Sequence, residues 1–352
     1  KDYRGAIDSF NMMGARADSI GQIANYQLGN CYIQTKNKVA ALDAFAAASR
    51  YSYDTDIEED SYFNYAKLAF DLNNDSSVFY DYLSRYSDRV KGERIYSYIA
   101  VAALHDRDYA AAVEAYGKID YLDGAMRSHY MKANYLRAEQ LISRGSYRNA
   151  IPCLKIAAYY SERGSRFNQL SRFWLAESYY RNDEFVQARN IYTDLYNTSA
   201  LYGREESSLI VYNIAYTYFK EGNYQLARKW FEEYLSMDTV KYRKDALERQ
   251  GDCYFITKQY KAATEAYDKV LKSYFDVNDI YPYYQSGISY GLDRNLDKKI
   301  QLLSNVLDAS CESKFYPEAM YELGRSYAVK EDDENAFMCF NRIVDSVMDS
   351  TF

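Results

Sequence analysis

The segment "AYTYFKEGNYQLARKWFEEYL" (residues 215–235) decides the fold, because it reads as one complete helix–turn–helix unit. An apolar and aromatic run ends at Lys220 and Glu221, Gly222 and Asn223 are typical turn residues, and a second amphipathic run follows. A unit that recurs predicts a repeat array whose chemistry is recognition, whereas a single copy would be one detail of a globular enzyme.

The unit recurs along the whole chain. Alanines at the start of the second run share one column, which Val78 and Lys299 complete in register: Ala6, Ala41, Ala112, Ala150, Ala188, Ala227, Ala263 and Ala336. Four residues later comes a large apolar side chain: Phe10, Phe45, Tyr82, Tyr116, Leu154, Tyr192, Phe231, Tyr267, Leu303 and Phe340. Twelve residues before the alanine column comes a small residue: Gly29, Ala66, Ala100, Ala138, Ala176, Ala215, Gly251, Gly287 and Gly324. Small residues at fixed positions let two antiparallel helices approach closely.

Composition agrees with an almost entirely helical chain, since only 3 of the 352 residues are prolines, which break helix interiors. The formal net charge of −7 argues against a nucleic-acid partner, which is usually met by a basic surface. No apolar stretch is long enough to predict a transmembrane helix. Residue Lys1 already opens an amphipathic run, so we expect the chain to be part of a longer protein whose targeting segment lies outside it.

These columns resemble the tetratricopeptide repeat family, most closely at Leu28-Gly29-x-x-Tyr32 and Leu323-Gly324-x-x-Tyr327. The resemblance implies an all-α fold, a right-handed superhelical solenoid of antiparallel helix pairs in which each pair contacts only its neighbours. We expect a single array over residues 1–352. It would begin with the second helix of a truncated repeat at residues 1–14. The expected hairpins span residues 20–50, 58–86, 92–120, 130–160, 168–197, 206–237, 243–273, 280–308 and 316–348.

The repeat period averages about 37 residues, longer than the 34 that is usual for the family. In this respect the chain resembles the arrays of bacterial envelope proteins, such as Tol-Pal-associated periplasmic proteins and lipoproteins of outer-membrane assembly. That resemblance implies a periplasmic or outer-membrane-associated location, with the cytoplasm as the alternative.

The sequence contains no P-loop, GxGxxG, GxSxG, HExxH or EF-hand string. His105 and His129 are its only histidines, and neither is spaced for a metal site or a catalytic triad. Its five cysteines are widely spaced and include no CxxC, which fits neither a disulfide framework nor a zinc site. We therefore predict no catalytic residue, no metal site and no cofactor, and a protein that is not an enzyme.

An aromatic stripe runs along the first helices, because seven of the nine residues located three positions before the small column are rings. In the tetratricopeptide family this helix face lines a concave groove, and amphipathic tyrosine suits such a surface. The alternative is that the rings only pack against the neighbouring repeat. Trp230 falls in a packing column and is not a candidate. The candidate groove residues are Tyr135, Phe173, Tyr180, Tyr212, Tyr216, Phe219, Phe255 and Tyr284.

The function that the resemblance implies is a non-catalytic scaffold for protein–protein interaction, which binds a peptide or protein segment in the concave groove. Two alternatives remain open: a glycan- or cell-wall-associated binding protein, and an accessory region of a longer protein whose activity lies elsewhere. Self-association through the solenoid ends is a further expectation, since the unpaired helix at residues 1–14 leaves an apolar face to cover.

Overall fold

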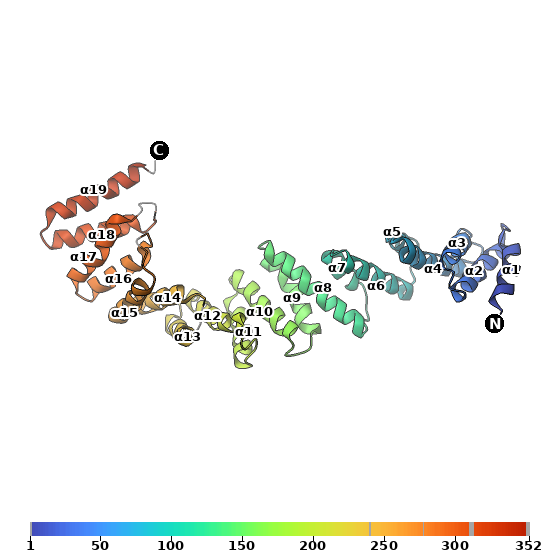
Figure 1. Ribbon diagram of the computed structural model, residues 1–352, viewed down its shortest axis with the longest axis horizontal. Helices are drawn as coiled ribbons and strands as arrows, with labels where there is room; N and C mark the ends of the chain where they lie inside the picture. Colours follow the sequence, from blue (N-terminus) through green and yellow to red (C-terminus); the bar gives the residue numbers. More distant parts are fainter. Residues whose placement is uncertain (1, 239–240, 277, 310–312, 350–352) are drawn as a thin grey trace. The chain divides into compact units, whose positions relative to one another are not determined.

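The computed structural model describes residues 2–238, 241–276, 278–309 and 313–349. Within these ranges the chain is all-α and contains no β-strand, which confirms the predicted fold class (Figure 1). No helix in this part of the chain is both long and apolar enough to cross a membrane.

The chain divides into two compact units, and helix α9 (Tyr147–Tyr160) contributes residues to both. The first unit comprises Lys1–Gly145 and Pro152–Ser161, and the second comprises Ser146–Ile151 and Glu162–Phe352. The other helices of the first unit are α1 (Tyr3–Gly14), α2 (Ser19–Gln34), α3 (Lys38–Ala48), α4 (Thr55–Asn73), α5 (Ser77–Arg85), α6 (Arg89–His105), α7 (Tyr109–Tyr116) and α8 (Gly124–Ser143).

The second unit continues the same alternation of first and second helices. Its helices are α10 (Arg166–Arg181), α11 (Phe185–Asn197), α12 (Glu205–Lys220), α13 (Tyr224–Ser236), α14 (Arg243–Ile256), α15 (Tyr260–Ser273), α16 (Ile280–Leu292), α17 (Leu296–Ser304), α18 (Tyr316–Val329) and α19 (Asp333–Asp349). A short 3-10 helix, η1 (Asn305–Asp308), follows α17.

The turn between α12 and α13 shows why consecutive helices reverse direction. Gly222 has φ 78°, a left-handed conformation that glycine adopts without steric cost. The Gly222 N–H bonds the Phe219 carbonyl at 3.1 Å, and the Asn223 N–H bonds the Tyr218 carbonyl at 2.9 Å, which is a Schellman cap. Asn223 then caps α13 by accepting a hydrogen bond from the Leu226 N–H at 3.3 Å. The same segment thus ends one helix and starts the next.

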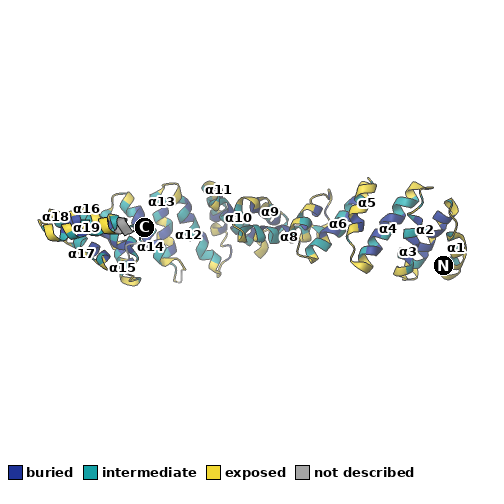
Figure 2. Ribbon diagram, turned by 90° about the horizontal axis from the view of Figure 1, so that it is seen from above, coloured by how far each residue is buried: buried dark blue, intermediate teal, exposed yellow. Residues whose placement is uncertain are grey.

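The small column lies where the two helices of a pair approach most closely. A Cβ placed on Gly251 would lie 2.6 Å from the ring of Tyr267, and one on Gly29 would lie 2.8 Å from the ring of Phe45. The small residue of each first helix therefore faces the large residue of its own second helix. Figure 2 shows the consequence, with buried residues on the facing sides of the helices and exposed residues at turns.

Many tyrosines pack their rings between helices and donate their hydroxyl groups to carboxylates. The pairs include Tyr26–Asp60, Tyr62–Asp81, Tyr82–Glu59, Tyr86–Glu58, Tyr192–Glu177, Tyr254–Glu232, Tyr267–Asp252 and Tyr290–Asp268. Hydrogen bonds to a charged acceptor are stronger than those between neutral groups. These pairs give the abundant tyrosine a structural role, which the aliphatic side chains of an ordinary helical core could not fill.

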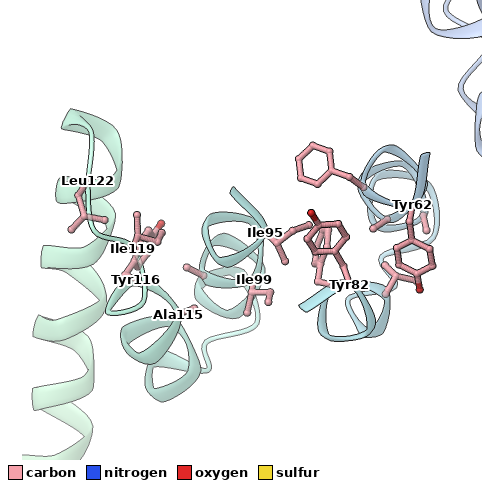
Figure 3. Close-up of a cluster of buried hydrophobic side chains, with 14 residues drawn as sticks. Tyr62, Tyr82, Ile95, Ile99, Ala115, Tyr116, Ile119 and Leu122 are labelled. Atoms are coloured by element: carbon pink, nitrogen blue, oxygen red, sulfur yellow. The ribbon is translucent and has the colours of Figure 1, made fainter. Parts of the chain in front are cut away.

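Figure 3 shows the buried rings of the first unit, where Tyr62 and Tyr82 belong to one buried cluster with Ile95 and Ile99. The same cluster continues through Tyr116 at the end of α7 and into the linker that leads to α8. A polar linker thus carries buried apolar side chains, Ile119 and Leu122, which fix the start of α8 against α7 (Figure 3).

Candidate functional site

Three aromatic candidates lie together on α12. Tyr212, Tyr216 and Phe219 are spaced i, i+4 and i+7, so they share one face of the helix. The ring centroids of Tyr212 and Tyr216 are 4.8 Å apart, and those of Tyr216 and Phe219 are 6.1 Å apart. All three rings contact the ring of Phe231 on α13, at centroid distances of 6.2, 5.5 and 6.4 Å. One side of the row is thus packed, and all three side chains remain half-buried.

Asp245 on α14 ties this row to the next helix pair. The Tyr212 hydroxyl donates to Asp245 Oδ2 at 2.7 Å, and the Tyr216 hydroxyl donates to the same oxygen. Burial, followed by the bond to this carboxylate, raises the pKa of both phenols far above their ordinary value. Both tyrosines are therefore neutral donors at any physiological pH, and their ring positions are fixed by one shared acceptor.

Arg249 is the centre of the cluster on α14. Its guanidinium lies 3.5 Å from Asp245 Oδ1, 3.4 Å from Glu248 Oε2, and pairs closely with Asp252. It also lies 6.0 Å from the ring centroid of Phe219 and 5.2 Å from that of Tyr281 on α16. A guanidinium over ring faces is stabilised by cation–π attraction. Burial is the largest single influence and would lower the pKa of Arg249, but Asp252, Tyr281 and Asp245 together outweigh it and the pKa is raised.

Asp252 closes the network on its far side. It is buried, and it accepts hydrogen bonds from the hydroxyls of Tyr267 on α15 and Tyr281 on α16. The path from Tyr212 to Tyr281 therefore alternates hydroxyl, carboxylate and guanidinium groups across the helices α12, α14 and α16. We call these residues the α14 cluster; they are Tyr212, Tyr216, Phe219, Asp245, Glu248, Arg249, Asp252 and Tyr281.

Glu248 is the acidic exception in the aromatic stripe. It is 9% exposed, and burial followed by the charge of Asp279 raises its pKa to about 7. The cluster therefore sets three carboxyl groups against one guanidinium, and one of those carboxyls changes its charge near neutral pH. No group of acidic, histidine and cysteine side chains suited to holding a metal ion occurs among the described residues.

Residues 212–282, which include the whole α14 cluster, match the family model of the tetratricopeptide repeat. This segment of the chain therefore carries the sequence pattern of the tetratricopeptide repeat. This family typically provides non-catalytic scaffolds. A comparison with curated protein sequences gave no match.

Solved structures of tetratricopeptide repeat proteins align with parts of this chain at low identity. PilF of Pseudomonas aeruginosa aligns at 16% identity over 62% of this chain and 91% of its own, with a TM-score of 0.45. MamA of Desulfovibrio magneticus aligns at 19% identity over 62% and 96%, with a TM-score of 0.37. YrrB, a repeat protein with an unusual peptide-binding site, aligns at 20% identity over 51% and 86%, with a TM-score of 0.41.

The repeats bring together three of the eight residues predicted to form the groove: Tyr212, Tyr216 and Phe219. Tyr180 is half-buried against Phe185, and burial raises its pKa to about 12. Phe255 packs against Tyr260, and Tyr284 stacks on Phe315. Tyr135 is half-buried and belongs to the first unit.

Phe173 differs from the other seven predicted residues. Its side chain is 4% exposed and packs against Tyr192 and Trp174 in the core of the second unit. A ring enclosed in this way has no surface to offer a ligand, so Phe173 is a packing residue.

The polar half of the cluster was missed by the sequence analysis. Asp245, Glu248, Arg249 and Asp252 are spaced i, i+3, i+4 and i+7, so they share one face of α14. That spacing is also typical of a solvated helix face. A search for aromatic columns therefore does not identify these polar residues. A single arginine amid three acidic residues on the stripe face was the available signal.

Proposed function

We propose that this chain is a non-catalytic scaffold that binds a segment of a partner protein along the first-helix face of α12, α14 and α16. One observation carries the proposal: the α14 cluster holds four rings, three on α12 and one on α16, in fixed positions. Ring packing or a hydroxyl hydrogen bond fixes the position of each of these side chains, which are Tyr212, Tyr216, Phe219 and Tyr281. Preorganised aromatic side chains bind with little loss of conformational entropy, which is why they dominate interface energetics.

The charge of the face indicates the chemistry of the partner segment. Asp245, Glu248 and Asp252 exceed the single charge of Arg249, and the whole chain carries a formal net charge of −7. Tyrosine rings attract cations through their faces, and acidic surfaces steer cationic partners towards them. We therefore propose a segment that combines apolar side chains with lysine or arginine.

A selection from a random peptide library on the purified chain tests this proposal. We expect the selected peptides to be enriched in basic and apolar residues, and their affinity to fall as salt is raised, because salt screens the acidic face. The sequences of the selected peptides give their composition, and fluorescence polarisation with labelled peptides measures how their affinity depends on salt. Selected peptides that are acidic, or whose affinity is independent of salt, would contradict the proposed chemistry.

The variant Phe219→Ala locates the binding face. We expect it to weaken peptide binding about tenfold, since interface aromatics typically contribute more than 1 kcal/mol. Phe337→Ala is the matched control, because Phe337 on α19 is an exposed phenylalanine outside the cluster. Circular dichroism of both variants verifies that the helices are retained. Equal affinities for the two variants would place the binding site elsewhere on the molecule.

A further inference from the structure

A second candidate site lies in the first unit, where the linker after α7 meets the end of α9. A cavity of about 610 Å³ opens there, within the size range of small-ligand sites. Tyrosines make up half of its lining residues, with one arginine and one aspartate as its charged groups. The side chains that the argument uses are Tyr116, Asp120, Tyr121, Arg127, Tyr130 and Tyr159.

Tyr116 provides the first observation that points to a ligand. Its side chain is 1% exposed, and its hydroxyl has no hydrogen-bond partner among the described residues. Three tyrosines in the same column of the second helices, Tyr82, Tyr192 and Tyr267, each donate their hydroxyl to a carboxylate of the first helix of their own pair. Tyr116 is the one tyrosine of this column that lacks its carboxylate, and a buried unpaired hydroxyl is costly.

Arg127 provides the second observation. Its Nε donates to the Leu122 carbonyl at 2.9 Å, which anchors the guanidinium at the cavity, and its centre lies 6.0 Å from the ring centroid of Tyr121. Asp120, the acidic residue of the wall, pairs with Arg89 at 3.0 Å. Arg127 forms no ion pair with any described residue. The cavity thus has an exposed cationic fork, and Tyr116, whose hydroxyl is buried and unpaired, lies in its wall; both groups are donors suited to a carboxylate.

The rings at the mouth of the cavity provide the third observation. Tyr121 is 74% exposed and Tyr159 is 79% exposed, so two large rings are accessible beside the cavity. Behind them, the rings of Tyr116, Tyr130 and Tyr160 follow one another at centroid distances of 5.7 and 5.8 Å. Exposed tyrosines beside a cavity offer flat apolar faces together with hydroxyl groups.

We propose that this cavity binds an acidic sugar, a pyranose that carries a carboxylate. Arg127 and the Tyr116 hydroxyl hold the carboxylate, and Tyr121 and Tyr159 contact the faces of the ring. A sugar satisfies the tyrosine hydroxyls through its own hydroxyl groups, whereas a peptide carboxylate would leave most of them to solvent. The site is distinct from the α14 cluster, so either proposal stands without the other.

Calorimetric titration of the purified chain tests the proposal with defined probes. Digalacturonic acid and N-acetylneuraminic acid distinguish a uronic acid from a sialic acid as the source of the carboxylate, and galactobiose is the neutral reference. We expect at least one acidic sugar to bind and the neutral sugar not to bind. Equal binding of acidic and neutral sugars, or no binding of any of them, would overturn the proposal.

Three variants assign the carboxylate contacts. Arg127→Gln and Tyr116→Phe should each weaken binding of the acidic sugar about tenfold or more, because each removes a donor to a charged group. Tyr82→Phe is the matched control from the same column and should leave the affinity unchanged, since the Tyr82 hydroxyl is already bonded to Glu59 at 2.6 Å. Unchanged affinity in both cavity variants contradicts the assignment.

An acidic peptide ending in two glutamates serves as the competing ligand class. We expect it to leave the bound acidic sugar in place. Displacement of the sugar at a lower concentration of peptide than of free sugar would show that the cavity prefers a peptide carboxylate, and the proposal would then be wrong.

Discussion

Tyr267 in the second unit and Tyr116 in the first occupy the same column of their helix pairs, but their hydroxyl groups have opposite surroundings. The Tyr267 hydroxyl donates to Asp252, which also accepts from the Tyr281 hydroxyl and pairs with Arg249. The Tyr116 hydroxyl has no partner among the described residues. The repeat pattern determines where the tyrosine ring lies, whereas the residues of the individual helix pair determine whether its hydroxyl group has a hydrogen-bond partner.

This difference indicates what each region is built to do. In the α14 cluster the tyrosine hydroxyls donate to carboxylates that in turn pair with Arg249, and these bonds fix the positions of the rings. At the cavity beside α7 the polar groups are left over, which suits a ligand that supplies the missing acceptor. One tyrosine column thus supports a structural network in one region and the proposed binding site in the other.

The largest effect that we predict comes from removing the shared carboxylate of the network. Asp252→Ala removes a buried carboxylate that pairs with the half-buried Arg249 guanidinium and accepts from the hydroxyls of Tyr267 and Tyr281, and such losses typically cost about 3–5 kcal/mol. Because a two-unit chain need not unfold in one step, hydrogen exchange of the α14 and α15 amides is the appropriate measurement. Protection there should fall steeply.

Asp297→Ala is the control for this substitution. Asp297 is exposed and pairs with Lys330 at 2.6 Å, and surface pairs of this kind contribute about 0–1 kcal/mol. If the two substitutions lower amide protection in their own helices by similar amounts, the network is not the stabilising element described here.

The second prediction concerns pH. The pKa of Glu248 is raised from 4.5 to about 7 by burial, so the folded state favours its protonated form. The stability that this provides is fully present below pH 4.5 and is lost as pH rises from 4.5 through 7. Glu248→Gln mimics the protonated side chain, and it should therefore stabilise the second unit at pH 8, by about 2 kcal/mol, with little effect at pH 4.5.

Urea unfolding at pH 8 and pH 4.5, monitored through the amide protection of α14, measures the change in stability that Glu248→Gln causes at each pH. Glu265→Gln is the control, because Glu265 is an exposed glutamate on the adjacent helix α15. A stabilisation by Glu248→Gln that is the same at pH 8 and pH 4.5 would exclude the buried carboxylate as its cause.

The all-α fold of paired helices could be predicted from the sequence because its determinants are local and repeated. Gly222 and Asn223 predict a turn, and the spacing of Gly251 and Tyr267 predicts which residues of two adjacent helices are in contact. Each of these contacts joins residues that are close in sequence, so the spacing within one repeat is enough to predict it. Because the same spacing recurs in repeat after repeat, the prediction of paired helices was unambiguous.

The candidate site could be predicted only in part, because its polar contacts join different repeats. The ring row Tyr212, Tyr216 and Phe219 follows from helical spacing. Its attachment to Asp245 depends on how two pairs pack together, which spacing does not reveal. Phe173 shares the column of Tyr212 but packs into the core against Tyr192 and Trp174, so column membership alone did not determine exposure.

The smallest predicted effect tests the comparison of the two tyrosines directly. Tyr267→Phe removes a donor from Asp252 and should destabilise the second unit by about 1–2 kcal/mol, the usual contribution of a hydrogen bond to a charged group. Tyr116→Phe removes a hydroxyl that has no partner, so it should be neutral or slightly stabilising, because it ends the cost of burying that group. Hydrogen exchange of α15 and α7, measured without added ligand, reports both changes. A comparable loss of protection in the two variants would mean that the Tyr116 hydroxyl is satisfied in solution, and the distinction between the two regions would fail.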